Sequence, residues 1–206
     1  MSNKRGRPLG TGHAGQVRYM TPDELDRFLR ASSKEGRKWD LLFSLTYYLA
    51  LRVSEAATIR LEDFSDPPGF VTIQGLKHGL KRPYPLPEPI QRKLRLWLRE
   101  RAKMPGADIN PYLFPHRDYV ETGHLSAVSI QCSFYRIAKH AGLSPHSVHD
   151  LRHTAAQDLV RNKEGLGQVA SWLRHRDLES SKIYINHGQD LELDQRQVER
   201  ASRRFK

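Results

Sequence analysis

Two polar residues in the C-terminal half have the types and spacing expected of an anion site. His149 and Arg152 lie three residues apart, so on a helix their side chains leave from the same face, with Cβ atoms about 5–6 Å apart. A cation beside a histidine is a poor structural pair unless an anion joins them. Two other interpretations stay open: a solvated polar face, and a zinc site through His149 and His153. The zinc site is less favoured because no glutamate follows the first histidine and no third ligand is evident.

His175 and Tyr184 are a second pair of residues able to do chemistry. Nine positions separate them, which is about two and a half turns of one helix and would place them on opposite faces. If both side chains reach one site, the chain must break between them. Asp177 can serve as the N-cap of a new short helix that carries the tyrosine.

These residues resemble the C-terminal signature of the tyrosine recombinases, the phage integrase family: His-x-x-Arg, then Leu-x-His, then a tyrosine nine positions later. Residues 50–55 (Ala-Leu-Arg-Val-Ser-Glu) resemble its first arginine box. Residues 75–86 resemble its hairpin with a catalytic lysine, and counting back from Pro-Leu selects Lys77 rather than Lys81. The family's six polar positions are filled in order across residues 21–190: Arg52, Lys77, His149, Arg152, His175 and Tyr184.

The resemblance implies a reaction without metal, cofactor or ATP. A tyrosine hydroxyl, here that of Tyr184, attacks a DNA phosphodiester and leaves a 3′-phosphotyrosyl link and a free 5′-hydroxyl. A phenol with an ordinary pKa of about 10 must lose its proton, and His149 is the implied acceptor. Lys77 would return a proton to the leaving 5′-oxygen.

Arginines suit the charge that builds on the phosphate, because a planar guanidinium can bind two oxygens at once. Arg52 and Arg152 would form this clamp, with His175 as a further donor. Glu55 lies one helical turn after Arg52 and either orients it or a histidine, or is an acid favoured by the helix dipole. We expect a structural hydrogen bond rather than catalysis from His153.

The sequence departs from the family at three places. Ala50 and Arg174 stand where the family usually has glycine; since those glycines serve close packing, we expect altered local geometry rather than altered chemistry. About twenty residues precede the catalytic region, whereas family members typically carry an N-terminal DNA-clamping domain. Short relatives such as the fimbrial phase-variation recombinases likewise have a catalytic region without that domain.

The elements that must position these groups are mainly helical, in an α+β arrangement. Thr21 is a predicted N-cap, followed by Pro22 in the first turn and Glu24 to close a capping box. Helical periodicity returns near residues 38–50, from 53, and over 90–98, 130–141, 151–159 and 169–173. Residues 70–73 and 84–86 predict a small antiparallel sheet after the third helix, with the second strand at an edge because of Pro83 and Pro85.

We expect residues 1–20 to form a flexible basic arm and residues 21–206 one recombinase catalytic domain. About residues 189–206 should form a C-terminal helix, which either docks on a neighbouring protomer, as is common in the family, or packs on its own domain. Docking would give a dimer or tetramer on DNA. In the arm, residues 4–8 (Lys-Arg-Gly-Arg-Pro) resemble an AT-hook, which would read an A·T-rich minor groove; non-specific tethering is the alternative.

The composition favours a nucleic-acid partner. The 206 residues include 34 Lys+Arg and 23 Asp+Glu, a net charge of +11, as is typical of proteins that bind polyanions. The resemblance narrows the partner to double-stranded DNA. The candidate DNA-binding residues come from the arm and from the basic run over residues 77–103: Lys4, Arg5, Arg7, Lys81, Arg82, Arg92 and Lys93.

The same composition argues against a membrane or secreted protein. The longest apolar stretch, residues 41–53, is interrupted by polar residues and is shorter than the roughly 20 residues that span a bilayer. No secretory segment is evident, and Cys132 is the only cysteine, which fits a reducing cytoplasm. The resemblance implies a nucleoid-associated protein that is bacterial, archaeal or phage-encoded.

Two rival functions are compatible with part of these sequence features. A type IB topoisomerase-like enzyme uses similar groups to cut and reseal one duplex without exchanging partners. A DNA-binding accessory protein would not cut at all, but it would have no need of the nucleophile Tyr184.

Overall fold

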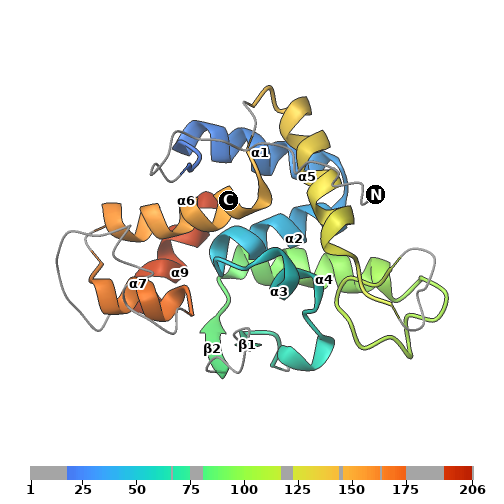
Figure 1. Ribbon diagram of the computed structural model, residues 1–206. Helices are drawn as coiled ribbons and strands as arrows, with labels where there is room; N and C mark the ends of the chain where they lie inside the picture. The colour runs from blue at the N-terminus through green and yellow to red at the C-terminus, as the bar shows by residue number, and fades with distance from the viewer. Residues whose placement is uncertain are drawn as a thin grey trace, which may run out of the picture.

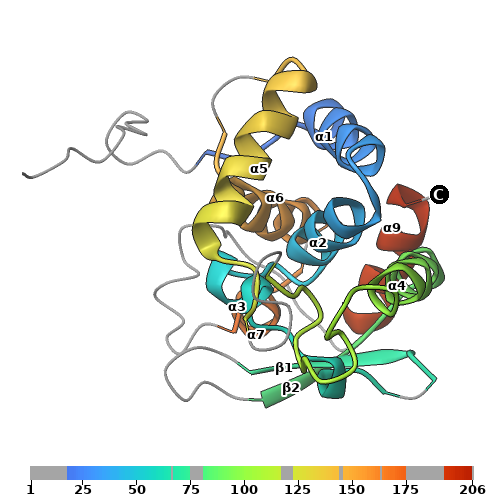
Figure 2. The same ribbon diagram turned by 90° about the vertical axis from the view of Figure 1, so that its right-hand side faces the viewer.

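The helix α2 (Arg37–Tyr48) forms the centre of the domain in the computed structural model, and all of it but the first turn is buried. Its residues from Leu41 to Tyr48 are all buried, as expected of a helix that packs against neighbours all round. α1, α3, α4 and α6 contact it, and Figures 1 and 2 show it in the middle of the helices.

The structure describes residues 18–65, 67–74, 81–116, 123–143, 146–162, 164–174 and 193–205. In addition to α2, these residues form α1 (Pro22–Lys34), α3 (Val53–Ala57), η1 (Leu61–Asp63), β1 (Phe70–Gln74), β2 (Lys81–Pro85), α4 (Glu88–Arg101), α5 (Ala127–His140), α6 (Val148–Arg161), α7 (Leu166–Trp172) and α9 (Leu193–Arg204). The prediction of a mainly helical domain with one small antiparallel sheet is confirmed. Within the described ranges, no helix has the length and apolar character that crossing a membrane requires.

α1 begins where the sequence predicts. The Glu24 backbone N donates to Thr21 Oγ1 at 3.3 Å, and the Thr21 backbone N donates to Glu24 Oε2 at 2.8 Å, which completes the predicted capping box. One turn later, Phe28 packs against Phe43 of α2 and Phe134 of α5, with ring centroids 5.2 Å and 4.6 Å apart. This aromatic cluster joins the three helices.

The two strands form an antiparallel hairpin that carries one large side chain toward α7. Phe70 pairs with Pro85 and Val71 with Tyr84. The second strand starts at Lys81, earlier than predicted, because Pro83 is tolerated where both strands of a two-stranded sheet are edges. Tyr84 is fully buried, and its ring lies 4.9 Å from that of Trp172 in an edge-to-face contact.

The C-terminal helix α9 packs on the same chain, against α4 and β2. Phe205 meets Tyr47 of α2 at 6.1 Å between ring centroids, and Arg204 Nη1 binds Asp26 of α1 at 2.6 Å. Docking of this helix on a neighbouring protomer stays a prediction.

Ala50 and Arg174, the two positions where the family usually has glycine, both have left-handed backbones. Their φ angles are 49° and 55°, in the region that glycine enters freely and that costs other residues about 1–2 kcal/mol. The altered local geometry expected at these positions is therefore a strained backbone at the ends of α2 and α7.

We expect Ala50→Gly to be nearly neutral. Relief of about 1–2 kcal/mol of strain offsets about 0.8 kcal/mol for the lost methyl group and about 0.5–1 kcal/mol for the freer unfolded chain. Ala155→Gly, in the equally buried interior of α6, has no strain to relieve and should cost about 1.5 kcal/mol. Urea unfolding of both variants measures the difference; equal losses would contradict it.

Candidate active site

The N-terminus of α6 places His149 and Arg152 in its first two turns, as predicted. Ser147 caps the helix: its backbone N donates to Asp150 Oδ2 at 3.1 Å and its hydroxyl to Asp150 Oδ1 at 3.0 Å. His146 lies against the same carboxylate, with Nδ1 3.1 Å from Asp150 Oδ2 and Nε2 3.7 Å from Glu24 of α1. The buried imidazole therefore joins the start of α6 to the start of α1.

This contact should make stability depend on pH. The hydrogen bond to Asp150, assisted by the charges of Asp150 and Glu24, raises the pKa of His146 despite its burial. The pKa values of both carboxyls are lowered, so both stay ionised above about pH 5. Because the pKa of His146 is higher in the folded state, protonation of this imidazole stabilises the fold. The stabilisation is complete below the unfolded-state pKa of about 6.5 and is lost as pH rises through the folded-state pKa.

His146→Gln should remove this pH-dependent part. The free energy of unfolding, measured by urea titration between about pH 6 and about pH 9, should fall with pH more steeply in the wild type than in the variant. His124→Gln, at a half-buried imidazole whose Nδ1 lies 3.0 Å from the Leu125 carbonyl oxygen rather than from a carboxylate, is the matched control and should keep the wild-type slope. Identical slopes in the wild type and in His146→Gln would exclude the effect.

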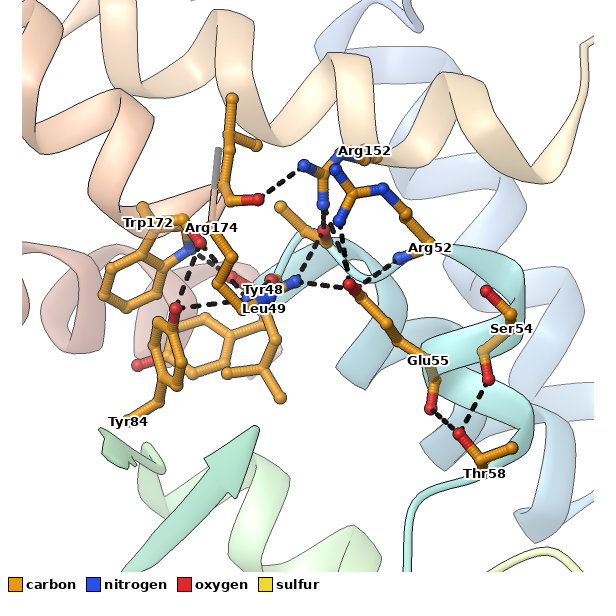
Figure 3. Close-up of polar contacts among 12 residues, drawn as sticks. Tyr48, Leu49, Arg52, Ser54, Glu55, Thr58, Tyr84, Arg152, Trp172 and Arg174 are labelled. Atoms are coloured by element: carbon orange, nitrogen blue, oxygen red, sulfur yellow. Dashed lines mark hydrogen bonds and ion pairs between the residues drawn. The ribbon is translucent and has the colours of Figure 1, made fainter. Parts of the chain in front are cut away.

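Glu55 holds Arg52 in place (Figure 3). Arg52 Nη1 donates to Glu55 Oε1 at 2.8 Å, and the Arg52 backbone N donates to Glu55 Oε2 at 2.9 Å. The carboxylate thus contacts the arginine side chain and caps α3, and its part in the site stays a prediction. The Glu55 side chain is 2% exposed and that of Arg52 is 32% exposed, which leaves the guanidinium reachable from solvent.

Arg152 reaches the same carboxylate from α6. Its Nη1 lies 4.0 Å from Glu55 Oε2 and donates to the Ala50 carbonyl, while its Nη2 donates to the Leu173 carbonyl. The side chain is 2% exposed. The structure therefore brings together Arg52 and Arg152, the two predicted phosphate-binding arginines, around one glutamate.

Arg174 is a third guanidinium in this cluster, which the sequence motifs did not assign to the site. Nη2 donates to Glu55 Oε2 at 2.9 Å, and the side chain is 2% exposed. Its remaining contacts come from α2, β2 and α7 (Figure 3): Leu49 O at 2.9 Å, Ala50 O at 3.0 Å, Tyr84 Oη at 3.2 Å and Trp172 O at 3.2 Å. The only signal in the sequence was a long charged residue where the family has glycine.

The two histidines of α6 favour their neutral forms. Partial burial, together with the charges of Arg152 and Arg52, lowers the pKa of His149, although its side chain remains exposed at the surface. Burial and the neighbouring His149 lower the pKa of His153 to about 4. Their rings meet edge to face at 4.4 Å between centroids. A neutral His149 near pH 7 has a free lone pair with which to accept a proton.

Several predicted site residues lie outside the described residues: Lys4, Arg5, Arg7, Lys77, His175 and Tyr184. Their roles stay predictions. Among the residues that are described, no group of three or more His, Cys, Asp and Glu side chains is arranged to hold a metal ion. In this part of the chain, His149 and His153 therefore have no third ligand.

The described residues of the basic run over 77–103 divide into inward and outward ones. Lys93 turns inward: Nζ donates to Asp40 Oδ1 at 2.6 Å and to Ser44 Oγ at 3.0 Å, and the side chain is 15% exposed. Arg82 is half-buried over the rings of Tyr84 and Trp172, whereas Lys81 and Arg92 are exposed.

Comparison with known proteins shows the family of this chain. The model of the phage integrase family matches residues 18–190. Tyrosine recombinase XerA of Pyrococcus furiosus is 27% identical over 165 residues, which cover 80% of this chain and 56% of the relative. Tyrosine recombinase XerD of Brucella suis is 33% identical over 147 residues, 70% of this chain and 47% of the relative. The chain thus spans about half the length of these curated relatives.

Solved structures give the same result for the fold. A crystal structure of XerA recombinase superposes with a TM-score of 0.73 at 23% identity, over 94% of this chain and 67% of that one. The XerH site-specific recombinase, solved with a palindromic difH substrate in a post-cleavage complex, superposes with a TM-score of 0.70 at 25% identity, over 90% of this chain and 52% of that one.

Proposed function

Because the chain belongs to the phage integrase family, we propose that residues 21–206 are the catalytic domain of a tyrosine-type, site-specific DNA recombinase. The observation that carries the proposal is the buried cluster in which Glu55 holds Arg52 beside Arg152. Two guanidiniums fixed at one point suit a phosphodiester, since each can bind two oxygens.

The proposed reaction begins when the Tyr184 hydroxyl attacks the phosphorus of a DNA phosphodiester. A bond forms between the phenolic oxygen and phosphorus, and the bond from phosphorus to the 5′-oxygen breaks. His149 accepts the phenolic proton, and Lys77 protonates the leaving 5′-oxygen. Rejoining runs these steps in reverse, with the 5′-hydroxyl as nucleophile. The phosphotyrosyl ester keeps the energy of the broken bond, so neither ATP nor a metal is needed.

Charge grows on the non-bridging oxygens as this reaction proceeds. Arg52 and Arg152 would bind those oxygens, with His175 as a third donor. Both arginines are held in place before DNA binds, Arg52 by Glu55 and Arg152 by the Ala50 and Leu173 carbonyls. Donors fixed in advance stabilise a transition state without reorganisation during the reaction.

Double-stranded DNA is the proposed substrate, and a dimer or tetramer on DNA is the proposed assembly. The post-cleavage complex of XerH with its difH substrate supports a DNA substrate by analogy. Lys81, Arg82 and Arg92 would contact the phosphate backbone, together with the arm residues Lys4, Arg5 and Arg7. Lys93 is not among the proposed contacts, because Asp40 pairs with its charge inside the domain.

The proposal is tested with a nicked suicide substrate. A binding site is first selected from random-sequence duplexes with the full chain, and a nick is then placed so that cleavage releases a short fragment and religation fails. The wild type should form a DNA adduct that resists SDS. Tyr184→Phe should form none, and Tyr135→Phe, at a half-exposed tyrosine of α5, should keep it.

No adduct from the wild type on its selected site, or an adduct that survives Tyr184→Phe, would overturn the proposal. Two plasmids that each carry the selected site then separate recombination from relaxation. A recombinase exchanges strands between them, whereas a type IB topoisomerase-like enzyme only relaxes each plasmid.

A further inference from the structure

We infer that Arg174 is a positioning residue of the active site, which holds Glu55 in place for Arg52 and fixes its own left-handed backbone just after α7. The inference rests on the proposed function for its catalytic consequence. The contacts of Arg174 do not depend on that function.

Arg174 completes a chain of contacts through one carboxylate. Glu55 Oε2 accepts from Arg174 Nη2 at 2.9 Å and from the Arg52 backbone N at 2.9 Å, while Oε1 accepts from Arg52 Nη1 at 2.8 Å. Arg174 thus holds Glu55 Oε2 in place, while the side chain of Arg52 binds the other oxygen, Oε1. Without Arg174, Glu55 would lose a charged partner within the buried site.

The charge of Arg174 also keeps Glu55 ionised. Burial alone would raise the pKa of this carboxyl, but the charge of Arg174, the bond from the Arg52 backbone and the charge of Arg152 together lower it. Three guanidiniums around one carboxylate leave an excess of two positive charges (3 − 1 = +2). An anionic phosphate is the ligand that such an excess attracts.

The backbone of Arg174 has its own role. Its φ angle of 55° is left-handed, and a non-glycine residue keeps such a conformation only where surrounding contacts enforce it. Here its own side chain does so, by donating to carbonyls at the end of α2 and to Trp172 O at the end of α7. The left-handed backbone of Arg174, just after α7, is therefore held by its own guanidinium.

A merely structural ion pair is the rival explanation, and it makes different predictions. Loss of a structural pair lowers stability but leaves the pH dependence of DNA cleavage unchanged. Loss of a positioning residue changes the ionisation of Glu55, and with it the acid limb of the pH–rate profile.

The test compares the wild type with Arg174→Met and Arg174→Lys in the full chain. The ¹³C-carboxyl NMR signal of Glu55, identified by its absence in Glu55→Gln, is followed in a pH titration without DNA. In Arg174→Met the midpoint should move to higher pH, and Arg174→Lys should keep it close to wild type. Arg37→Met, which removes an exposed charge paired with Glu100 at 3.9 Å, should leave the midpoint in place.

Single-turnover cleavage of the suicide substrate supplies the second measurement. For Arg174→Met we expect a rate about 10²-fold lower, the size of effect that small misplacements of catalytic groups produce, and an acid limb at higher pH. If Arg174→Met does not fold, Arg174→Lys and Arg174→Gly carry the test; glycine relieves the backbone but lacks the cation, so it should resemble methionine.

An unchanged Glu55 midpoint in Arg174→Met, or in Arg174→Gly if only that variant folds, would overturn the inference. So would a cleavage profile that keeps its acid limb. A wild type that forms no adduct contradicts the proposed function instead, and the titration of Glu55 still decides whether Arg174 controls this carboxylate.

Discussion

Glu55→Leu should lower the free energy of unfolding by about 3–5 kcal/mol, the cost of removing one partner from a buried ion pair. The side chains of Arg152 and Arg174 are each 2% exposed, so they cannot recover hydration when the carboxylate is lost. Urea unfolding at neutral pH measures the change. Glu55→Gln keeps an acceptor oxygen and should cost less.

Two controls make this prediction specific. Glu88→Leu breaks an ion pair with Arg95 whose side chains are 68% and 43% exposed, and it should cost less than about 1 kcal/mol. Glu55→Leu combined with Arg174→Met removes both charges, and should be less destabilised than the sum of the two single variants. Additive losses would mean that the two residues do not stabilise each other.

Arg152→Lys should slow single-turnover DNA cleavage by about 10²–10³-fold, as expected when one preorganised donor to a developing oxyanion is lost. Lysine keeps the charge but has no planar fork, so it cannot bind a phosphate and the Ala50 and Leu173 carbonyls together. The rate of adduct formation on the selected suicide substrate measures the effect at saturating enzyme.

A second arginine of the same helix provides the comparison. Arg161 lies at the end of α6, pairs with Asp158 at 3.5 Å and has a side chain that is 39% exposed. Arg161→Lys should change the cleavage rate less than about twofold, as a surface substitution away from the site. Equal losses at both positions would place the defect in DNA binding rather than in the chemistry.

Local signals in the sequence predicted local structure well. The capping box at Thr21 and Glu24 depends on residues three positions apart, and the structure confirms it. The spacing of His149 and Arg152 on one helix is likewise confirmed. The sheet was predicted from β-rich residues and prolines, although its second strand begins earlier than expected. In each case the interacting residues lie within fifteen positions of each other in the sequence.

Contacts between distant segments could not be predicted in this way. The family motifs name a glycine before the histidine, so the arginine at 174 appeared only as a local departure; its partner Glu55 lies 119 residues away. Lys93 looked like part of a DNA-binding run because its partner Asp40 lies 53 residues away. Charge runs do not show which side chains turn inward.

The two carbonyls that directly follow α2 contact two of the three arginines, Arg152 and Arg174. Ala50 O accepts from both Arg152 and Arg174, and Leu49 O accepts from Arg174. The C-terminal end of a helix carries about half a unit of negative charge, so the most buried helix of the domain presents its negative pole to these cations. The helix end replaces part of the water that buried guanidiniums lose. The positive charge of the site can therefore be kept in the absence of DNA, and a phosphate of the proposed substrate would meet two cations that are already desolvated, Arg152 and Arg174.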